Sequence, residues 1–314
     1  MAFSATIDSS QIFPVVTLSD SSNGTKAEIY SFGALLNQFI LKTKEGNLNM
    51  VDGFLSPHSA LQEITQGFKS AFLSPFTCRM NEGKYEFGEK AYQVEKFFMP
   101  PHAIHGLVYD AAYKIENTEE TETFALVKLT HTYNKEDVGY PFSYSISHTW
   151  KLETGNKLSV STTIIHHNTQ AIPYAQGWHP YFTLGTSVDA CSLQFTTDTQ
   201  VEFDDTLLPN GNTINDNRFV AGVSLKDIIL DNCFHLASKG THNCVLSNDL
   251  VKLTITPDKS YPYLQIYTPP HRKSIAIENL SGAPDCFNNE LGLLLLEPNE
   301  AITFATHYSA EKLA

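Results

Sequence analysis

A histidine lies among aromatic residues in the hexapeptide GWHPYF, residues 177–182. The unperturbed pKa of histidine is about 6.5, so the side chain can both donate and accept a proton near neutral pH. Pro180 biases His179 towards an extended backbone, and the rings of Tyr181 and Phe182 can form a wall of a pocket. Two interpretations follow: a histidine packed in the core, which is more usual in such surroundings, or a proton donor at the floor of a pocket.

A carboxylate ends an apolar segment in IAIENLSGAPD, residues 275–285. Side chains alternate between the two faces of a strand, so Ile275 and Ile277 share one face while Ala276 and Glu278 share the other. The serine, glycine and proline that follow indicate a turn. Glu278 is therefore either a residue at the rim of the sheet or a general base.

Two further segments place polar side chains next to aromatic residues or turns. In PFTCRMNEG, residues 75–83, Arg79 offers a planar set of donors that suits hydroxyl groups or carboxylates. A surface arginine paired with Glu82 is the alternative that the local sequence favours. In HAIHG, residues 102–106, strand alternation points His102 and His105 to opposite faces, and no carboxylate or cysteine lies at ligand spacing. This pattern indicates hydrogen-bonding or ordinary loop imidazoles more than metal ligands.

The composition is that of a folded protein with an acidic balance. Of the 314 residues, 42% are hydrophobic and 18% are charged. The 21 lysines and arginines against 34 aspartates and glutamates give a net charge of −13. This charge disfavours binding to nucleic acid or to an anionic membrane, but it leaves a small uncharged ligand open.

The cysteines and apolar runs indicate a reduced, cytoplasmic protein. The five cysteines are scattered without C-x-x-C spacing, which predicts neither a disulfide framework nor a thiolate zinc site. The first residues lack the basic and long apolar regions of a signal peptide, and the longest strongly apolar run, residues 291–296, is too short to span a bilayer. The chain also lacks the G-x-S-x-G, P-loop and G-x-G-x-x-G motifs, and no pair of acids can be assigned to a glycosidase.

The elements that must position these residues are mainly strands, because large residues recur at every second position. The segments with this pattern are residues 27–36, with a kink at Gly33, 142–150, 158–164, 251–256 and 263–268. The second and third flank a turn at 153–156, which predicts a hairpin. The last two repeat the pattern, with Pro262 in the turn region between them.

Helical periodicity is scarce, and only residues 59–65 and 223–228 predict a helix, of one or two turns each. Strands that recur about every ten residues, with glycine, asparagine and proline turns, predict a sandwich or a barrel. No linker, charge block or internal repeat divides the chain. We therefore predict a single all-β domain over residues 1–314.

Taken in their order along the chain, the four polar segments resemble the aldose 1-epimerase (galactose mutarotase-like) family, particularly its broader branch of shorter sugar epimerases. The resemblance extends over nearly the whole chain and rests on six motifs in the family's order. They are P-F-x-x-R-x-x-x-G-x-Y at 75–85, H-G at 105–106, G-Y-P-F at 139–142, Asn168 ahead of GWHPYF, L-D-N-C-F at 230–234, and Glu278 followed by P-D-x-x-N at 284–288.

The resemblance implies a large antiparallel β-sandwich, the galactose mutarotase-like supersandwich, with few short helices, an open cleft and no metal or organic cofactor. By position, His179 matches the family's general acid and Glu278 its general base. Arg79 and His105 match residues that hold sugar oxygens, and Asp231 matches a substrate-binding acid.

Two departures from the family's pattern concern the sugar's identity more than the proton chemistry. The family's fuller arginine-asparagine motif is here Thr77-Cys78-Arg79, with one arginine kept. After Glu278, residues 279–281 read Asn-Leu-Ser where the better-known galactose enzymes carry Thr-Gln.

The chemistry that the resemblance implies is the interconversion of the α and β anomers of a free hexose through ring opening. A base removes the proton of the anomeric hydroxyl while an acid protonates the ring oxygen. Unperturbed pKa values of about 4.3 for glutamate and 6.5 for histidine make the carboxylate of Glu278 the expected base and the imidazolium of His179 the expected acid. We expect the two groups on opposite sides of the sugar, separated by the width of its ring, with Arg79 helping to keep Glu278 ionised.

Two other functions remain open at this level. A hexose-6-phosphate 1-epimerase of the same fold would need several basic side chains around the cleft, for which Arg79, Lys84, Arg272 and Lys273 are the candidates. A non-catalytic carbohydrate-binding protein would keep the cleft without turnover, although this chain keeps both an acid and a base by type. We expect a small-molecule sugar as the partner, no nucleic acid, no membrane, and a monomer or homodimer.

Overall fold

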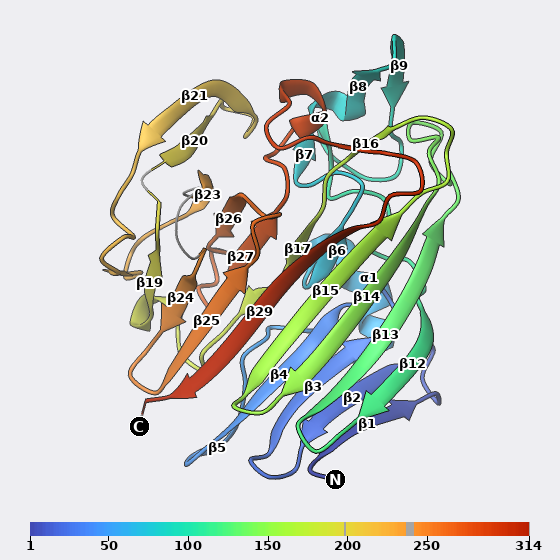
Figure 1. Cartoon of the computed structure of the whole chain (residues 1–314). Coiled ribbons are helices and arrows are strands. Elements are labelled where there is room, and N and C mark those ends of the chain that lie inside the picture. Colours follow the sequence, from blue (N-terminus) through green and yellow to red (C-terminus); the bar gives the residue numbers. More distant parts are fainter. Residues whose placement is uncertain (198, 237–241, 314) are drawn as a thin grey trace.

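The chain folds into layers of antiparallel strands (Figure 1). The computed structural model describes residues 1–197, 199–236 and 242–313. Three large sheets dominate, and the described chain has two short α-helices, α1 (Pro57–Glu63) and α2 (Cys286–Asn289). Short 3-10 turns span Ile64–Gln66, Asn81–Gly83 and Val188–Ala190. The predicted all-β antiparallel sandwich with few short helices is confirmed.

Among the described residues, no helix has both the length and the apolar character needed to cross a membrane.

A nine-stranded sheet forms one layer of the molecule. Its strands, in spatial order, are β12 (Lys114–Glu120), β13 (Phe124–Tyr133), β14 (Tyr144–Glu153), β15 (Lys157–Ile165), β29 (Ile302–Lys312), β25 (Val251–Pro257), β24 (Cys244–Ser247), β19 (Ser192–Phe195) and β22 (Val223–Ser224). Burial alternates along β14 and β15 because one face packs on the core and the other meets solvent. These two strands form the predicted hairpin, with Leu152 opposite Leu158.

An eight-stranded sheet forms the layer that carries the site. Its strands, in spatial order, are β21 (Pro209–Asn215), β20 (Thr199–Phe203), β23 (Asp231–His235), β26 (Tyr263–Tyr267), β27 (Ile275–Leu280), β17 (Gly177–His179) and β6 (Ala71–Leu73), and β18 (Tyr181–Phe182) also pairs with β27. Every residue of β27 is buried. This central strand is therefore covered on both faces.

A five-stranded sheet and three small sheets complete the architecture. The five-stranded sheet consists of β1 (Phe3–Asp8), β2 (Val15–Asp20), β3 (Thr25–Tyr30), β4 (Leu36–Thr43) and β5 (Gly46–Asn49). The turn between β3 and β4 contains Gly33 in a left-handed conformation, φ 63°, which confirms the predicted kink there. The small sheets are β10 (Phe98–Met99), β11 (His102–Ile104) and β7 (Arg79–Met80); β16 (Ile172–Tyr174) and β28 (Leu294–Leu296); and β8 (Lys84–Phe87) and β9 (Lys90–Gln93).

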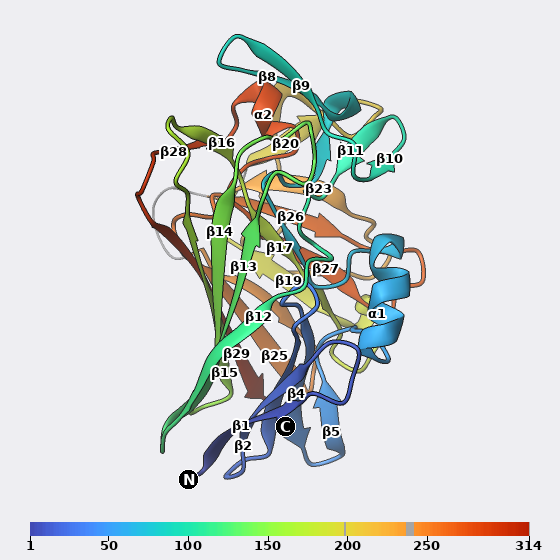
Figure 2. The same cartoon turned by 90° about the vertical axis from the view of Figure 1, so that its right-hand side faces the viewer.

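The main core lies between the nine-stranded and eight-stranded sheets and is rich in aromatic rings. Trp150 of β14 contacts Trp178 of β17 with ring centroids 5.4 Å apart, and Phe182 of β18 contacts Tyr308 of β29 at 5.9 Å. In Figure 2, α1 lies on the opposite side of β17 and β27 from β13 and β14. The eight-stranded sheet thus has an inner face on the main core and an outer face towards α1.

Two sequence predictions about elements are wrong or incomplete. Residues 223–228 were expected to be helical, but Val223–Ser224 pair with β19 as strand β22 and a turn follows. The strands predicted at 251–256 and 263–268 are present, yet they do not pair with each other. β25 lies between β24 and β29 in the nine-stranded sheet, whereas β26 lies between β23 and β27 in the eight-stranded sheet, so the chain crosses between layers near Pro262.

Candidate active site

A pocket of about 190 Å³ opens on the outer face of the eight-stranded sheet, and we refer to it as the central pocket. All five residues selected from the sequence line it: Arg79, His105, His179, Asp231 and Glu278. They come from five separate segments of the chain, between residues 79 and 278. The sheet topology brings them together.

Strand register arranges the floor of the central pocket as two rows of side chains. The first row is Cys233, Gln265, Glu278 and His179, and the second is Asp231, Tyr267, Ala276 and Tyr181. Residues directly opposite each other in antiparallel strands project from the same face, so each row runs across β23, β26, β27 and β17 or β18. The polar members of both rows, apart from the fully buried Cys233, consequently line one cavity.

His179 and Glu278 lie side by side on this floor. The Nε2 atom of His179 is 3.3 Å from Oε1 of Glu278, and the two side chains are 6% and 2% exposed. The expected separation by the width of a sugar ring is therefore wrong. Trp178 pairs with Asn279 in adjacent antiparallel strands, and this register places the next residues, His179 and Glu278, beside each other on one face.

Burial changes the proton affinities of this pair in opposite directions. Burial raises the pKa of the Glu278 carboxyl well above its ordinary value; the charge of Asp231 raises it further, while Arg79 opposes the shift. Burial lowers the pKa of His179 to about 4. Both shifts favour uncharged side chains, so the carboxylate and imidazolium expected from unperturbed pKa values are not the arrangement that burial favours.

A row of rings packs behind His179. Tyr181 stacks on its imidazole with centroids 5.1 Å apart, and His105 meets it edge-on at 4.9 Å. Phe68 in turn contacts His105 at 4.5 Å. Burial, followed by the influence of His179 and Arg79, lowers the pKa of His105 well below its ordinary value, so this imidazole is neutral. Its Nδ1 atom is buried and makes no hydrogen bond with the described part of the chain.

Asp231 is held in place by a residue that the sequence did not single out as functional. Nε2 of Gln265 donates a hydrogen bond to Oδ1 of Asp231 at 2.8 Å. Burial raises the pKa of the Asp231 carboxyl, and Arg79 opposes the rise. The second oxygen of Asp231 has no hydrogen bond among those described here, so it can accept one from a ligand hydroxyl.

Arg79 begins β7 and faces the central pocket. The alternative of an ion pair with Glu82 does not hold, because Glu82 pairs with Lys84 at 2.6 Å. Asp285 fastens the backbone here: its N–H donates to the Arg79 carbonyl at 2.7 Å, and its Oδ1 accepts from the N–H of Asn81 at 2.8 Å. The P-D-x-x-N motif thus has a local role in holding Arg79 at the pocket.

His102 does not line the pocket. Its Nδ1 atom accepts a hydrogen bond from the backbone N–H of Glu82 at 3.1 Å, whereas His105 faces the cavity. The two histidines therefore point to different sides, as predicted, but strand alternation is not the reason, because β11 ends at Ile104 and His105 has a left-handed backbone, φ 65°. Of the pair, His105 belongs to the site and His102 supports the turn after β7.

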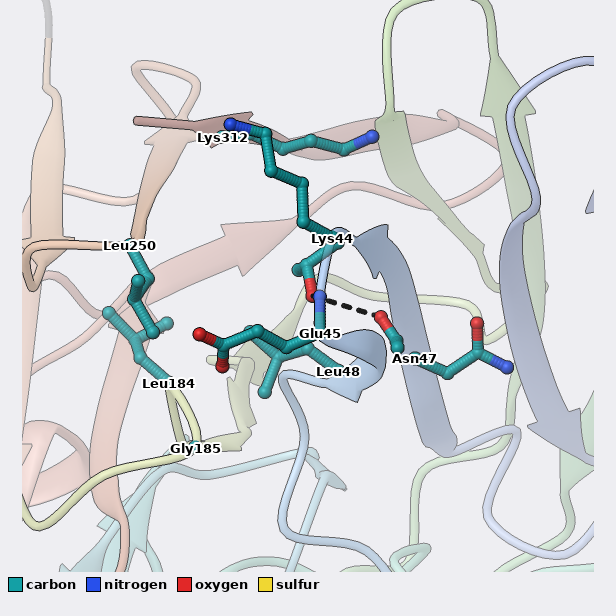
Figure 3. A pocket seen from close by; sticks show the side chains of 10 residues that line it. Lys44, Glu45, Asn47, Leu48, Leu184, Gly185, Leu250 and Lys312 are labelled. Carbon is teal, nitrogen blue, oxygen red and sulfur yellow. Dashed lines mark hydrogen bonds between the residues drawn. The ribbon is translucent and has the colours of Figure 1, made fainter. Parts of the chain in front are cut away.

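A second pocket, about 280 Å³ in volume, lies at the tip of the β4–β5 hairpin (Figure 3). Lys44, Glu45 and Lys312 lie around it, and Leu48 and Leu184 form its apolar side. It is larger than the central pocket, but its charged side chains are exposed and unconstrained by buried partners. In the central pocket, by contrast, the buried side chains of Glu278 and His179 lie together, and burial raises the pKa of the first and lowers that of the second. We therefore take the central pocket as the candidate active site.

Three lining residues of the central pocket carry no clear signal in the sequence: Cys78, Gln265 and Tyr267. Gln265 and Tyr267 share an alternating strand pattern with many others. Only the register of β26 against β27 shows that they face a cavity.

Comparison with known proteins gives a family match over most of the chain. The sequence model of the family described as Aldose 1-epimerase matches residues 14–309. The uncharacterised protein YihR of Escherichia coli K12 is 28% identical over 254 residues, which are 77% of this chain and 78% of that protein.

Solved structures share the fold at low sequence identity. A galactose mutarotase-like protein from Clostridium acetobutylicum has a TM-score of 0.87 at 17% identity, over 99% of this chain and 98% of its own. Galactose 1-epimerase from Lactobacillus acidophilus has a TM-score of 0.84 at 18% identity, over 99% and 98%. The GalM/aldose epimerase homologue from C. elegans has a TM-score of 0.82 at 21% identity, over 93% and 97%.

Proposed function

The chain belongs to the aldose 1-epimerase family, and from this premise we propose that it interconverts the α and β anomers of a free hexose. The observation that supports the proposal is the His179–Glu278 pair on the floor of the central pocket, with 3.3 Å between Nε2 and Oε1. Arg79, His105 and Asp231 surround the pair with a cation, a neutral imidazole and a carboxyl group. Such groups suit the hydroxyls of a sugar.

The side-by-side placement of His179 and Glu278 suits the reacting atoms. The ring oxygen and the anomeric oxygen of a pyranose are bonded to the same carbon, so they are close neighbours. One group can reach the anomeric hydroxyl while the adjacent group reaches the ring oxygen. An acid and a base on opposite sides of the sugar are not required.

In the proposed reaction, Glu278 takes the proton of the anomeric hydroxyl and His179 donates a proton to the ring oxygen. The bond between the anomeric carbon and the ring oxygen breaks, which gives an open-chain aldehyde with a free hydroxyl. Rotation about the bond between C1 and C2 presents the other face of the carbonyl. The hydroxyl then attacks that face while the two proton transfers run in reverse, and the ring closes as the other anomer.

The pair begins and ends each turnover with the same single shared proton. A carboxylate next to an imidazolium and a carboxylic acid next to a neutral imidazole contain equal numbers of protons. Ring opening converts the first arrangement into the second, and ring closure restores the first. Burial favours the uncharged arrangement in the free site, and that arrangement is one of the two states of the cycle.

Polarimetry on freshly dissolved α-glucose and α-galactose tests the proposal. We compare the wild type with Glu278→Gln and His179→Gln, and use the exposed residues Glu300→Gln and His307→Gln as matched controls. A general acid or base contributes on the order of 10² to 10⁴ in rate, so each site variant is expected to lose at least about a hundredfold. Equal rates for the wild type and both site variants, on either sugar, would refute the assignment.

A phosphorylated hexose is a poorer fit to the central pocket. A phosphate dianion is held by several basic side chains, and among the described residues that line this pocket Arg79 is the one lysine or arginine. Arg272, a sequence candidate for this role, instead pairs with Asp189 at 2.6 Å. Rates on glucose and on glucose 6-phosphate, measured side by side, are expected to favour the free sugar; faster turnover of the phosphate ester would reverse this choice.

The alternative of a sugar-binding protein without turnover makes a different prediction. Calorimetric titration with the same sugars would then give binding to the wild type, while polarimetry would show no acceleration over the uncatalysed reaction. We expect both binding and acceleration.

A further inference from the structure

The thiol of Cys78 lies against the carboxyl group of Glu278. The Sγ–H group donates to Oε2 of Glu278 at 4.0 Å, while Oε1 of the same carboxyl faces His179. Among the hydrogen bonds of the described residues, this thiol is the one donor to the Glu278 side chain. A thiol is a weak donor, so Oε2 is only weakly hydrogen-bonded on this side.

The backbone holds the thiol in this position. Cys78 has a left-handed conformation, φ 48°, which non-glycine residues rarely adopt. Hydrogen bonds fix the chain on both sides: Oγ1 of Thr77 donates to the carbonyl of Gly282 at 2.7 Å, and the N–H of His105 donates to the carbonyl of Cys78 at 2.9 Å. The left-handed conformation costs free energy, and the surrounding hydrogen bonds maintain it. This combination indicates that the fold holds the Cys78 side chain in a specific position.

The thiol keeps its proton and therefore acts as a donor. Burial raises the pKa of Cys78 well above its ordinary value, and the neighbouring Glu278 raises it further. A thiolate would place a second negative charge beside the carboxyl group. Cys78 is thus unsuited to be a nucleophile here. Its possible contribution to the site is the contact between its thiol and Glu278.

We propose that Cys78 is a positioning residue that, through its contact with Oε2, controls how readily Glu278 gives up and takes a proton. The inference rests on the proposed function only for its effect on turnover, since the contact and the titration of Glu278 do not depend on the substrate.

The other titratable groups around Glu278 come from several elements. They are His179 of β17, Tyr181 of β18, Tyr267 of β26, Arg79 of β7, His105 after β11, and Asp231 and Cys233 of β23. Substitutions at Cys78 leave these residues themselves unchanged. Opposite shifts of the Glu278 titration in two Cys78 variants can therefore be attributed to the replaced contact.

Two replacements of Cys78 are expected to shift the titration of Glu278 in opposite directions. Asparagine tolerates the left-handed backbone and is longer than cysteine, so its amide can donate a true hydrogen bond to Oε2. This bond stabilises the carboxylate and lowers the midpoint of the Glu278 titration by about one pH unit. Alanine removes the donor and raises the midpoint by a few tenths of a pH unit, that is, roughly 0.3.

The experiment follows the carboxyl carbon of Glu278 by NMR in protein labelled with ¹³C at the glutamate side chain, with Glu278→Gln identifying the signal. Cys191→Ala, which removes a buried thiol outside the pocket, is the matched control and should leave the midpoint unchanged. Equal midpoints in the wild type, Cys78→Asn and Cys78→Ala would overturn the proposal. So would shifts of the two Cys78 variants in the same direction, because a general disturbance of the fold has that effect.

The pH dependence of epimerisation provides the second readout. Stabilising the carboxylate moves the pH–rate profile of the coupled pair to lower pH, so Cys78→Asn should shift it to lower pH and Cys78→Ala to higher pH. If the wild type lacks epimerase activity, the proposed function fails while the NMR midpoints still decide the role of Cys78. If activity is present and the midpoints are unmoved, the inference about Cys78 alone fails.

Discussion

Glu278 lies between two opposite charges that act on its proton. The guanidinium of Arg79 lowers the pKa of this carboxyl group, and the carboxylate of Asp231 raises it. Neither charge exceeds the effect of burial, which is the largest cause of the upward shift. At the scale of single residues, the proton affinity of the site is therefore adjustable in both directions without touching the pair itself.

The first prediction compares the removal of each charge. Arg79→Met should move the pH–rate profile of epimerisation to higher pH, because the carboxylate loses a stabilising cation. Asp231→Asn should move the profile to lower pH, because the carboxylate loses a repelling anion. We expect displacements of about half to one pH unit, measured by polarimetry between pH 4 and 9. Displacements in the same direction would contradict this account of the site.

The resemblance of six ordered motifs to the aldose 1-epimerase family was enough to select five side chains that the fold places in one pocket. Their distances were not predictable, because the register of β17 against β27 decides whether His179 and Glu278 face each other or lie side by side. Gln265 illustrates the same limit. In the sequence it is one polar residue in an alternating strand, and nothing local shows that its face of the sheet borders a cavity.

At the scale of elements, the close approach of β17 and β27 depends on Gly177. A Cβ atom at this position would lie 2.5 Å from Cδ2 of Leu280 and 2.7 Å from the backbone oxygen of Asn279. These distances are too short for contact between carbon atoms or between carbon and oxygen. The glycine at the start of GWHPYF therefore sets the spacing of the two strands that carry His179 and Glu278.

The second prediction follows from this spacing. Gly177→Ala should push β17 away from β27, lower the free energy of unfolding by about 1 to 3 kcal/mol, and reduce kcat more than it raises KM. Gly67→Ala is the stability control, since a methyl group there meets open space. Chemical denaturation and steady-state kinetics measure the two effects. An unchanged kcat in Gly177→Ala would show that the strand spacing does not limit the reaction.

The third prediction concerns the turn that follows β27. Asp285 fastens the backbone of Arg79 and Asn81, and Nδ2 of Asn288 donates to its Oδ1 at 2.7 Å. Asp285→Ala keeps the main-chain bond to the Arg79 carbonyl but removes the side-chain acceptor for Asn81 and Asn288. It should cost about 1 to 3 kcal/mol of stability and raise KM more than it lowers kcat, because the turn next to Arg79 loosens while the His179–Glu278 pair stays. Asp285→Asn keeps an acceptor oxygen, so it should retain most of the stability and a KM close to that of the wild type. Equal losses in the two variants would argue against the fastening role.

Elements with one exposed face were predictable, and those buried on both faces or crossing between layers were less so. β14 and β15 alternate because solvent meets one side of the sheet. Residues 223–228 have helical spacing, yet Val223–Ser224 pair with the edge of β19 and form a strand. Pairing with a strand that is distant in sequence overrides the local helical pattern. The six residues 223–228 do not by themselves indicate that pairing.

At the scale of the whole molecule, a buried histidine links stability to pH. His148 lies between the two large sheets, with Nδ1 at 2.9 Å from Oγ1 of Thr162 and its ring against Trp178. Burial lowers its pKa to about 3. The folded protein keeps this imidazole neutral, whereas the unfolded chain takes up a proton below about pH 6.5. The stability is therefore complete above about pH 6.5 and is lost as the pH falls from there towards 3.

The fourth prediction is that His148→Gln reduces the acid sensitivity of the fold. Between pH 7 and pH 5, the wild type should lose on the order of 2 kcal/mol more unfolding free energy than the variant. Urea unfolding at both pH values measures the difference. The exposed His307→Gln should behave like the wild type, and an identical acid loss in wild type and His148→Gln would show that His148 is not the origin of the effect.

The contact between Trp150 and Trp178 has a practical consequence. The chain contains two tryptophans, and they touch each other directly behind the strand that ends in His179. Tryptophan emission, excited selectively over that of the 14 tyrosines, therefore comes from one place beneath the floor of the central pocket and is not averaged over distant parts of the protein. Occupation of the pocket by any ligand should be observable as a change in this emission, without a label and without turnover.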